Sequence, residues 1–292
     1  MQNFINQLSE ILEKQYILTR DEDKAPYLTD WRKRFTGKAF AVLLPSTSNE
    51  VAAIVRLCAQ HQIALVPQGG HTGFCGGATP DNSGKQVILN LKRMNQIREI
   101  DIANQTITLE AGCILQAVQE KAAENGYLFP LSLGAEGSCM IGGNLATNAG
   151  GTNVLRYGNT RDLCLGLEVV TAKGEIWNGI KGLRKDNTGY DLRDLFIGSE
   201  GTLCIITAAV MKLYPLPVSQ WTTLVACESI ASTIALLTLF QKRANALLTG
   251  FEMMTRESLD LNEKHFPQMA NPLQGNPPYT VLIELSDHES EE

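Results

Sequence analysis

The chain has 292 residues, of which 44% are hydrophobic and 19% are charged, so it can form a globular core and is not a disordered chain. Its formal net charge is -6 and its longest basic run is Arg32-Lys33-Arg34, which argues against nucleic acid as the main partner, because phosphate binding needs clustered Lys and Arg. The seven cysteines are widely spaced, without a C-x-x-C pair, as is typical of reduced thiols in a reducing compartment.

The N-terminal segment has the period of an amphipathic helix and lacks the positive start and continuous apolar run of a signal peptide. The apolar stretch from Ile230 to Phe240 is interrupted by hydroxyl side chains and is too short to cross a bilayer. We therefore predict a cytoplasmic protein without a transmembrane segment, which touches a membrane only peripherally, through a partner.

Residues 1–45 are predicted to form a helix, assigned within 1–35, and an irregular lead-in. Thr47-x-x-Glu50 is a capping-box signature, and the apolar residues after it fall on one helical face. Strands are predicted at 63–66, where Pro67 ends the strand, at 87–91 and at 106–110. A helix is predicted over 113–125.

A hairpin is predicted from strands 165–170 and 175–178, which turn at Lys173-Gly174, and a long apolar strand follows at 202–213. Pro215 and Pro217 interrupt the pattern, so we place a domain boundary at 216/217. The second domain is predicted to contain a strand at 221–227, a helix at 230–244, a strand at 247–253, a short helix, a Pro/Asn-rich loop at 267–278 and a strand at 279–285. Residues 286–292 have the pattern of a helix start, so we expect this domain to be truncated. A natural acidic tail is the alternative.

A glycine-rich loop directly follows the strand predicted at 63–66. It reads Pro67-Gln68-Gly69-Gly70-His71-Thr72-Gly73. Glycine allows positive φ and lets the backbone approach a ligand closely, and successive N–H groups in such a turn form a concavity that binds anions without a lysine. A pyrophosphate is the natural occupant, and a tight turn without a ligand is the alternative. The segment is neither a Walker loop nor a Rossmann fingerprint.

A second glycine-rich stretch, from Gly134 to Gly151, holds six glycines. Its small residues would let a flat ring system lie against the backbone, and its Ser, Asn and Thr side chains could bond the heteroatoms of that ring. A third loop spans 185–201. Three such loops on one domain are more than folding requires, so we predict a cofactor site rather than packed turns.

Together these segments resemble the FAD-linked oxidoreductases of the vanillyl-alcohol oxidase superfamily with a PCMH-type flavin domain, and within them the D-lactate and D-2-hydroxyglutarate dehydrogenase branch. The resemblance covers nearly the whole chain in order, through 67–73, 137–151, Arg156-Tyr157-Gly158, 166–170, 187–192 and 197–203. It implies an α+β fold, in which a two-subdomain FAD-binding PCMH-type domain (1–216) is followed by the first part of an α/β cap domain with an antiparallel sheet (217–292).

The resemblance also implies that FAD is the cofactor and that it is held in an extended form. It assigns the pyrophosphate to Gln68, Gly69, Gly70, His71, Thr72 and Gly73. It assigns the flavin and its ribityl chain to Ser138, Gly142, Gly143, Asn144, Thr147 and Asn148. It places Glu200, Gly201 and Ile206 near the adenosine end or the pyrophosphate. The predicted cofactor-binding set is completed by Pro67, Gly134, Cys139, Gly150 and Gly151.

The activity that the resemblance implies is oxidation of a small D-2-hydroxy acid, such as D-lactate or D-2-hydroxyglutarate, by hydride transfer from C2 to the flavin. The electrons would pass to a quinone, an electron-transfer flavoprotein or another carrier. Such chemistry needs a cation for the carboxylate, a base and commonly a divalent metal, and the family has these groups in the later part of the cap. We therefore predict no catalytic residue and no metal ligand in this chain. Family members are often homodimers, but no residue pattern here decides the oligomeric state.

The four histidines have different predicted roles. His61 is expected to cap a helix, His265 to lie in a polar loop and His288 in a solvated tail. His71 occupies the position where some relatives attach flavin covalently, but the rest of its loop resembles the non-covalent branch. We therefore predict that His71 lies beside the flavin or pyrophosphate without a bond to it, with covalent attachment as the alternative.

Two other functions stay open from the sequence. The chain could be an FAD-binding module without turnover, because the groups needed for catalysis are absent. It could instead be another oxidase of the superfamily, acting on a sugar lactone or an alcohol. The segment 187–192 and the stretch that starts at Gly137 favour the hydroxy-acid branch.

Overall fold

The computed structural model describes residues 2–268, 273 and 275–288, and it divides the chain into two compact units. Unit 1 comprises 1–129, 134–149 and 159–214, and unit 2 comprises 130–133, 150–158 and 215–292. Unit 2 therefore includes two short segments: 130–133, just before the second glycine-rich stretch, and 150–158, which begins at the end of that stretch. Part of the predicted loop 267–278 and residues 289–292 of the predicted terminal helix start lie outside the described residues. The helix start was wrong at its first residues, because Ser286 and Asp287 belong to the strand Tyr279–Asp287.

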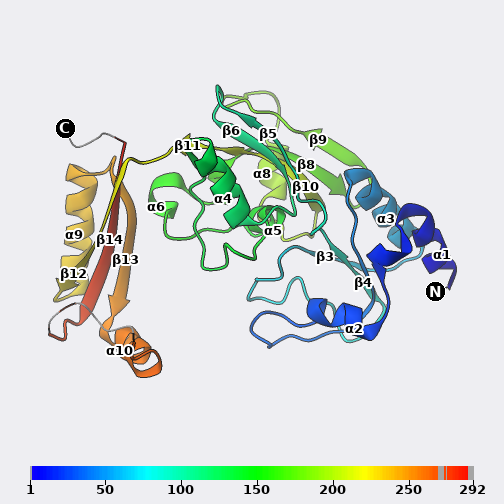
Figure 1. Ribbon diagram of the computed structural model, residues 1–292, viewed down its shortest axis with the longest axis horizontal. Coiled ribbons are helices and arrows are strands. Elements are labelled where there is room, and N and C mark those ends of the chain that lie inside the picture. Colours follow the sequence, from blue (N-terminus) through cyan, green and yellow to red (C-terminus); the bar gives the residue numbers. More distant parts are fainter. Residues whose placement is uncertain (1, 269–272, 274, 289–292) are drawn as a thin grey trace. The chain divides into compact units, whose positions relative to one another are not determined.

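The first sheet of unit 1 has the strand order β1-β2-β4-β3, and β3 and β4 are labelled in Figure 1. β2 (Ala39–Leu43) and β3 (Leu65–Gln68) both run parallel to β4 (Gln86–Asn90), whereas β1 (Ile17–Leu18) is antiparallel to β2. Its core includes Val42, Val66 and Ile88. The strand predicted to end at Pro67 in fact includes it, because β3 is an edge strand, where proline is tolerated.

The lead-in is less helical than predicted. α1 spans Gln2–Ile11, and it is followed by η1 (Lys14–Tyr16), α2 (Asp21–Lys24) and η2 (Ala25–Tyr27). The prediction of one lead-in helix within 1–35 was therefore wrong beyond Ile11, where the apolar period stops, and strand β2 was missed. α3 (Ser48–Gln60) begins as predicted, since the Thr47 hydroxyl accepts a hydrogen bond from the Glu50 N–H at 3.1 Å.

The second sheet of unit 1 is antiparallel, with the order β5-β6-β10-β8-β9. Its strands are β5 (Ile97–Asp101), β6 (Thr106–Glu110), β8 (Cys164–Thr171), β9 (Ile176–Gly179) and β10 (Cys204–Lys212), of which β5 was not predicted. The expected hairpin turn is present, and Gly174 has φ +72° there. The helices α4 (Leu115–Glu124), α5 (Ile141–Ala146), α7 (Thr160–Leu163) and α8 (Leu192–Phe196) and the short strand β7 (Tyr127–Leu128) occur between these strands, and the short strand β11 (Tyr214–Pro215) follows β10.

Helix α3 links the two sheets of unit 1. At its start the Ser48 hydroxyl donates to Glu168 of β8 at 2.5 Å, and further along Arg56 donates to the carbonyl of Gly174 at 2.5 Å. Glu168 is buried and also accepts from Thr207 of β10 at 2.9 Å. In sequence, α3 lies between two strands of the first sheet, β2 and β3. These contacts hold it against the second sheet.

Unit 2 contains a three-stranded antiparallel sheet in the order β12-β14-β13. Its elements are α6 (Val154–Tyr157), β12 (Ser219–Cys227), α9 (Ile230–Arg243), β13 (Leu248–Thr255), α10 (Arg256–His265) and β14 (Tyr279–Asp287). The strand–helix–strand–helix–strand order was predicted, but His265 ends helix α10 and is not in a loop. Val281 and Ile283 form the core under α9, together with Leu236, Leu237 and Phe240 of that helix.

Candidate cofactor site

The glycine loop, residues 69–78, starts where β3 ends and carries a row of unused backbone donors. Among the described residues, no backbone N–H from Gly69 to Gly73 donates a hydrogen bond to the chain. His71 has φ +56°, in the left-handed region, so the loop curls at its middle. Consecutive free N–H groups in such a curled segment bind an anion well, which fits the predicted pyrophosphate.

Two buried amide side chains hold the loop in this shape. Gln68 donates to the carbonyls of Tyr27 (3.0 Å) and Ala78 (2.8 Å), and it accepts from Asn90 at 3.1 Å. Asn90, at the end of β4, also donates to the Gly69 carbonyl at 2.9 Å and accepts from the Lys92 N–H at 3.0 Å. The Gln68 side chain therefore braces both ends of the loop instead of facing a ligand. Asn90 was missed, although it is a polar residue that ends an apolar strand.

The glycine loop packs directly on the second glycine-rich stretch. A Cβ on Gly70 would lie 2.1 Å from the Ser138 carbonyl oxygen, so only glycine fits there. A Cβ on Gly69 would lie 3.5 Å from Cβ of Met140 and 3.7 Å from the N of Gly143. The structure thus brings the two predicted segments together, with Ser138 exposed beside the contact.

Part of the second stretch forms a helix that was not predicted from the sequence. Gly142 and Gly143 lie in α5, and Gly142 packs on Ala111, to whose carbonyl its N–H donates at 2.8 Å. Asn144 is 4% exposed, and its amide oxygen has no hydrogen-bond partner among the described residues. A buried acceptor without a donor is costly, so this atom marks a place where a ligand donor would fit.

The end of α5 leads into two further predicted residues. The Thr147 hydroxyl is exposed and donates to the Gly143 carbonyl at 2.9 Å. Asn148 has φ +47°, and its side-chain oxygen accepts from the Arg161 N–H at 3.0 Å. The Asn148 amide oxygen therefore already serves the start of α7.

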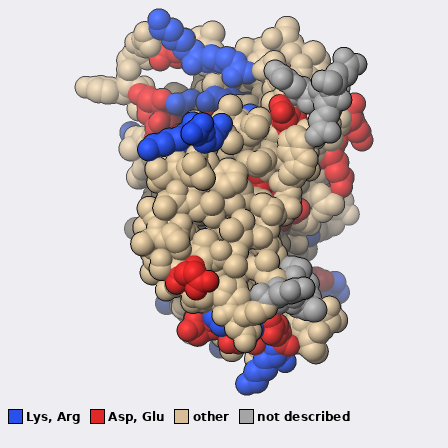
Figure 2. Space-filling model, turned by 90° about the vertical axis from the view of Figure 1, so that its left-hand side faces the viewer, with Lys and Arg blue, Asp and Glu red and all other residues tan. Residues whose placement is uncertain are grey.

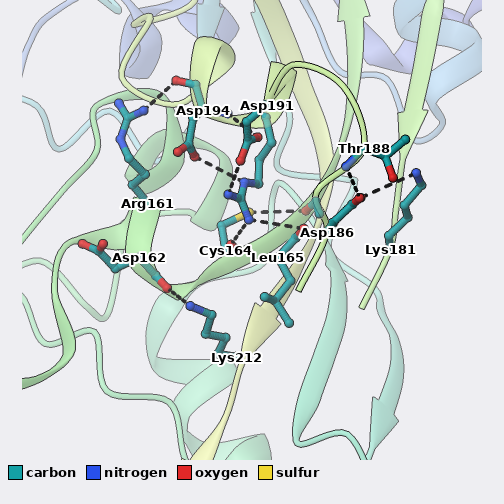
Figure 3. A network of polar contacts seen from close by, with 12 residues as sticks. Arg161, Asp162, Cys164, Leu165, Lys181, Asp186, Thr188, Asp191, Asp194 and Lys212 are labelled. Atoms are coloured by element: carbon teal, nitrogen blue, oxygen red, sulfur yellow. Dashed lines mark hydrogen bonds and ion pairs between the residues drawn. The ribbon is translucent and has the colours of Figure 1, made fainter. Parts of the chain in front are cut away.

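An arginine network anchors this region (Figure 3). Arg161 donates to the carbonyl of Asp194 at 2.6 Å, as Figure 3 shows. It also donates to the carbonyl of Ile197 at 2.8 Å, so it caps the end of α8. Arg193 donates to the Cys164 carbonyl at 2.8 Å and pairs with Asp191 at 2.6 Å. The predicted third loop, 185–201, is thereby fastened to β8 and, through Arg161, to Asn148.

The turn at Glu200-Gly201 lies beside the glycine loop. Glu200 (φ +53°) donates its N–H to the Ala146 carbonyl at 2.8 Å, and a Cβ on Gly201 would lie 3.2 Å from Cγ of Pro67. A Cβ on Gly77 would lie 3.9 Å from a Glu200 carboxylate oxygen. Ile206 is different, because its side chain is buried in the sheet at 5% exposure, next to a bulge in β10.

Three predicted glycines do not share these contacts. A Cβ on Gly134 would meet nothing within 4 Å. Gly150 and Gly151 belong to unit 2 rather than unit 1. A Cβ on Gly151 would lie 1.6 Å from the Ser132 carbonyl oxygen, so its lack of a side chain is needed for packing within unit 2.

Burial sets the protonation of two side chains in the site. It lowers the pKa of His71 from its ordinary 6.5, against the opposite influence of the Asp30 carboxylate, so the imidazole stays neutral near pH 7. His71 Nε2 lies 3.1 Å from the Thr79 hydroxyl. Burial likewise raises the pKa of the Cys139 thiol, which is therefore a neutral packing group. His61, by contrast, ends α3 and contacts Gln7 at 2.6 Å.

A cavity of about 200 Å³ also lies in unit 1, beside the turn at Gly201. It is lined chiefly by aliphatic side chains of α3, β3 and β8 and of the segment that enters β10. No local sequence pattern indicates this cavity, because its walls come from segments that are more than a hundred residues apart.

Among the described residues, every helix is too short or too polar to span a bilayer. The same residues contain no cluster of three or more His, Cys, Asp or Glu side chains with a metal-binding arrangement.

The site residues fit FAD in three respects. Free N–H groups of the glycine loop suit a pyrophosphate, Asn144 offers a buried acceptor, and close backbone packing at Gly69 and Gly70 keeps the two segments in contact. FAD would supply a redox-active isoalloxazine ring, which accepts a hydride. The residues of this chain would bind and orient it and would exclude water from its phosphates.

Comparison with known proteins supports this fit. Residues 39–179 match a family model described as an FAD binding domain. The D-2-hydroxyglutarate dehydrogenase, mitochondrial, of Bos taurus is 42% identical over 92% of this chain and 49% of its own length. The protein of the same name from Arabidopsis thaliana is 38% identical over 97% of this chain and 50% of its own length. The chain thus spans about half the length of the curated relatives it matches.

Solved structures agree on the fold. An alkyldihydroxyacetonephosphate synthase has a TM-score of 0.82 at 18% identity, over 98% of this chain and 56% of its own. A p-cresol methylhydroxylase has a TM-score of 0.74 at 20% identity, over 98% of this chain and 60% of its own. The predicted fold class, α+β with a PCMH-type FAD-binding domain and an antiparallel sheet after it, is confirmed. The chain thus contains an FAD binding domain over residues 39–179, and its cofactor is FAD.

Proposed function

We propose that this chain is the flavin-binding part of a dehydrogenase that oxidises a D-2-hydroxy acid to the 2-oxo acid, with FAD as hydride acceptor. The observation that carries the proposal is the row of unused N–H donors from Gly69 to Gly73, packed against α5 with its unpartnered Asn144 oxygen. Relatives named as D-2-hydroxyglutarate dehydrogenases give the substrate class.

Within this proposal the residues have distinct tasks. The N–H groups of residues 69–73 hold the pyrophosphate, and Gln68 and Asn90 keep the loop open for it. Ser138, Gly143, Asn144 and Thr147 line the flavin and its ribityl chain. The neutral His71 lies beside the cofactor without a covalent bond to it. No residue of this chain is assigned as base, carboxylate clamp or metal ligand.

We assign residues 1–216 to the FAD-binding domain and 217–292 to the N-terminal part of a substrate cap. The sheet β12-β14-β13 with α9 on one face supports a cap of this kind. D-2-Hydroxyglutarate and D-lactate are both within the substrate class, and a quinone or an electron-transfer flavoprotein is the proposed acceptor. A homodimer and a cytoplasmic location stay predictions, and the two relatives described above are named as mitochondrial.

One alternative is favoured by a specific observation. Because the chain spans about half of its curated relatives, it could bind FAD and yet lack turnover. In that case the described loops would be sufficient for binding, while the base and the carboxylate clamp would be missing.

The test is an anaerobic titration of the FAD-loaded chain with D-2-hydroxyglutarate and with D-lactate, followed by the visible absorption spectrum. Bleaching of the flavin bands by either acid supports the dehydrogenase. A flavin spectrum that stays oxidised supports the binding module. Absence of any flavin binding by a folded chain, as judged by circular dichroism, would contradict both.

A further inference from the structure

A basic turn in unit 1 has no part in the cofactor site described above. It consists of Trp31, Arg32, Lys33 and Arg34, and all four side chains are exposed. Within the described part of the chain, no carboxylate forms an ion pair with any of its three cations. Three unpaired positive charges are therefore concentrated on a chain whose formal net charge is -6.

A buried carboxylate fixes the backbone of this turn. Asp30 is 2% exposed, and its side chain accepts from the Arg32 N–H at 3.1 Å and from the Phe35 N–H at 2.6 Å. Thr29 and Thr36 pair on either side of the turn as an antiparallel bridge. The shape of the turn therefore does not depend on the charges of its three cations.

Exposed aromatic rings lie beside these cations. Trp31 is 67% exposed, and its ring centroid lies 5.6 Å from that of Phe74, which is 51% exposed and follows Gly73 in the glycine loop. The Arg32 guanidinium carbon lies 4.1 Å from the Phe74 centroid, within cation–π range. Phe35, at 46% exposure, lies against Gly76, where a Cβ would be 2.7 Å from its ring. The turn and the glycine loop thus share one exposed surface.

We call this surface the basic aromatic patch, made of Trp31, Arg32, Lys33, Arg34, Phe35 and Phe74. We infer that the basic aromatic patch binds the surface of an anionic lipid bilayer directly. Tryptophan rings favour the interface between headgroups and water, and clustered Lys and Arg side chains are attracted to anionic headgroups. A bilayer surface offers both environments side by side, as the patch requires. The contact with lipid is direct, whereas the sequence predicted membrane contact only through a partner.

The negative net charge of the chain does not oppose this contact strongly. Charges separated by more than about 8 Å are largely screened at physiological ionic strength, so the local charge of the patch decides the interaction with headgroups. Lipid contact would bring the glycine loop to the bilayer surface, which suits a lipid-soluble acceptor such as a quinone. That consequence rests on the proposed function, whereas the lipid contact itself does not depend on FAD.

Vesicle flotation tests the role of the cations, because aggregated chain without lipid does not float. We expect the chain to bind mixed phosphatidylcholine–phosphatidylglycerol vesicles and not pure phosphatidylcholine vesicles. The double variant Lys33→Asn and Arg34→Gln should bind the mixed vesicles at least tenfold more weakly. Asparagine suits position 33, where φ is +57°. Lys173→Gln with Lys185→Gln removes the same charge from exposed positions elsewhere in unit 1 and should bind within twofold of the wild type.

The aromatic rings are tested in the same assay. Trp31→Ala and Phe74→Ala should each weaken binding to mixed vesicles at least fivefold. Phe266→Ala is the matched control, because Phe266 is also 51% exposed but lies in unit 2, and it should bind like the wild type. Circular dichroism checks that every variant is folded.

Cys75 allows a measurement without any substitution. It follows Phe74 and is exposed, whereas the other six cysteines are buried, so a thiol-reactive, environment-sensitive fluorophore labels it selectively. We expect the emission of this label to rise at least twofold with mixed vesicles and to stay unchanged with pure phosphatidylcholine.

Three outcomes would overturn the inference. One is a wild type that does not float with mixed vesicles. Another is equal binding by the wild type and the folded double variant. The third is loss of binding in the charge variant with unchanged binding by both aromatic variants and an unchanged label, which would mean adsorption by charge alone. Binding of soluble poly-glutamate without vesicle binding would assign the patch to an acidic protein instead, and so would overturn it too.

Discussion

At the scale of single residues, the cofactor site depends on two backbone segments that approach each other too closely for a side chain to fit between them. Gly70 and Gly73 belong to the same loop but differ in surroundings. The space next to Gly70 is filled by the Ser138 carbonyl, whereas nothing lies within 4 Å of the Cβ position at Gly73. The same substitution at the two positions therefore distinguishes a steric clash at a crowded glycine from the general effect of losing a glycine in this loop.

We predict that Gly70→Ala lowers the free energy of unfolding by about 2 kcal/mol or more, because two backbone segments must move apart, and that it weakens FAD binding at least tenfold. Gly73→Ala should leave both within experimental error. Urea unfolding and fluorescence titration with FAD measure the two effects. Equal behaviour of the two variants would contradict the close packing at Gly70.

A substitution of Asn144 should affect stability and FAD binding in opposite directions. Its unpartnered, buried amide oxygen costs on the order of 1–3 kcal/mol in the absence of a ligand. Asn144→Leu should therefore leave the FAD-free chain as stable as the wild type or more stable, while FAD binding falls at least tenfold. Thermal unfolding with and without FAD is the measurement. Unchanged FAD affinity would remove Asn144 from the site.

His71 should give the FAD-free chain a specific pH dependence. Because its pKa is lowered in the folded state, the unfolded chain takes up the proton first as the pH falls below 6.5. The contribution of His71 to the free energy of unfolding is fully present above pH 6.5 and is lost as the pH falls through the lower, folded-state pKa. Urea midpoints at pH 8 and 5.5 should differ less in His71→Asn than in the wild type, whereas the exposed His265→Asn should behave like the wild type. Asparagine suits the test because it tolerates positive φ.

At the scale of elements, α9 shows how a well-formed helix can leave apolar surface uncovered. Ser229 caps its start, accepting from the Ser232 N–H at 3.1 Å, and its inner face packs on β14. Its outer face exposes Ile230 and Ile234, at 52% and 58%. The face of the molecule in Figure 2 accordingly has a broad central area without charged side chains. Exposed apolar patches of this kind, next to open sheet edges, favour association.

We predict that the chain self-associates as its concentration rises and that Ile234→Glu shifts it toward the monomer. Ala235→Glu, which adds the same charge at a neighbouring exposed position of α9, is the control and should have a smaller effect. Size-exclusion chromatography with light scattering at several concentrations measures the mass. A monomeric wild type at all concentrations would contradict the prediction.

At the scale of the whole molecule, the residues of the proposed cofactor site are concentrated in one of the two units. The glycine loop, α5 and the turn at Glu200 are all in unit 1, whereas the sheet β12-β14-β13 forms the core of unit 2. Bound FAD should therefore stabilise unit 1 more than unit 2.

Hydrogen exchange tests this directly. We predict that the N–H groups of residues 69–73, which have no acceptor within the described chain, exchange fast without FAD and slow at least tenfold when FAD is bound. Peptides from β13 and β14 should change little. Equal protection in both units, or none at 69–73, would contradict the proposed pyrophosphate site.

Much of this molecule could be predicted from local sequence. The capping pair at Thr47, the turn at Gly174, the strand at 106–110 and the glycine loop all express short-range chemistry, in which φ preferences and hydrogen bonds join residues close in the chain. The resemblance of ordered motifs gave the FAD cofactor. Strand β2 and helix α5 were missed because short elements have too few residues for a clear period.

Other features were decided only by the tertiary structure. The role of Gln68 as a brace depends on carbonyls from Tyr27 and Ala78, and the unpartnered oxygen of Asn144 depends on how α5 is buried. The separation of Gly150 and Gly151 into unit 2, and the cavity between α3 and β8, likewise join segments far apart in sequence. The sequence by itself determined the anion-binding glycine loop, because such a loop is local, and the resemblance of its ordered motifs implied FAD; the packing around the loop could be decided only by folding, because packing is a property of distant segments brought together.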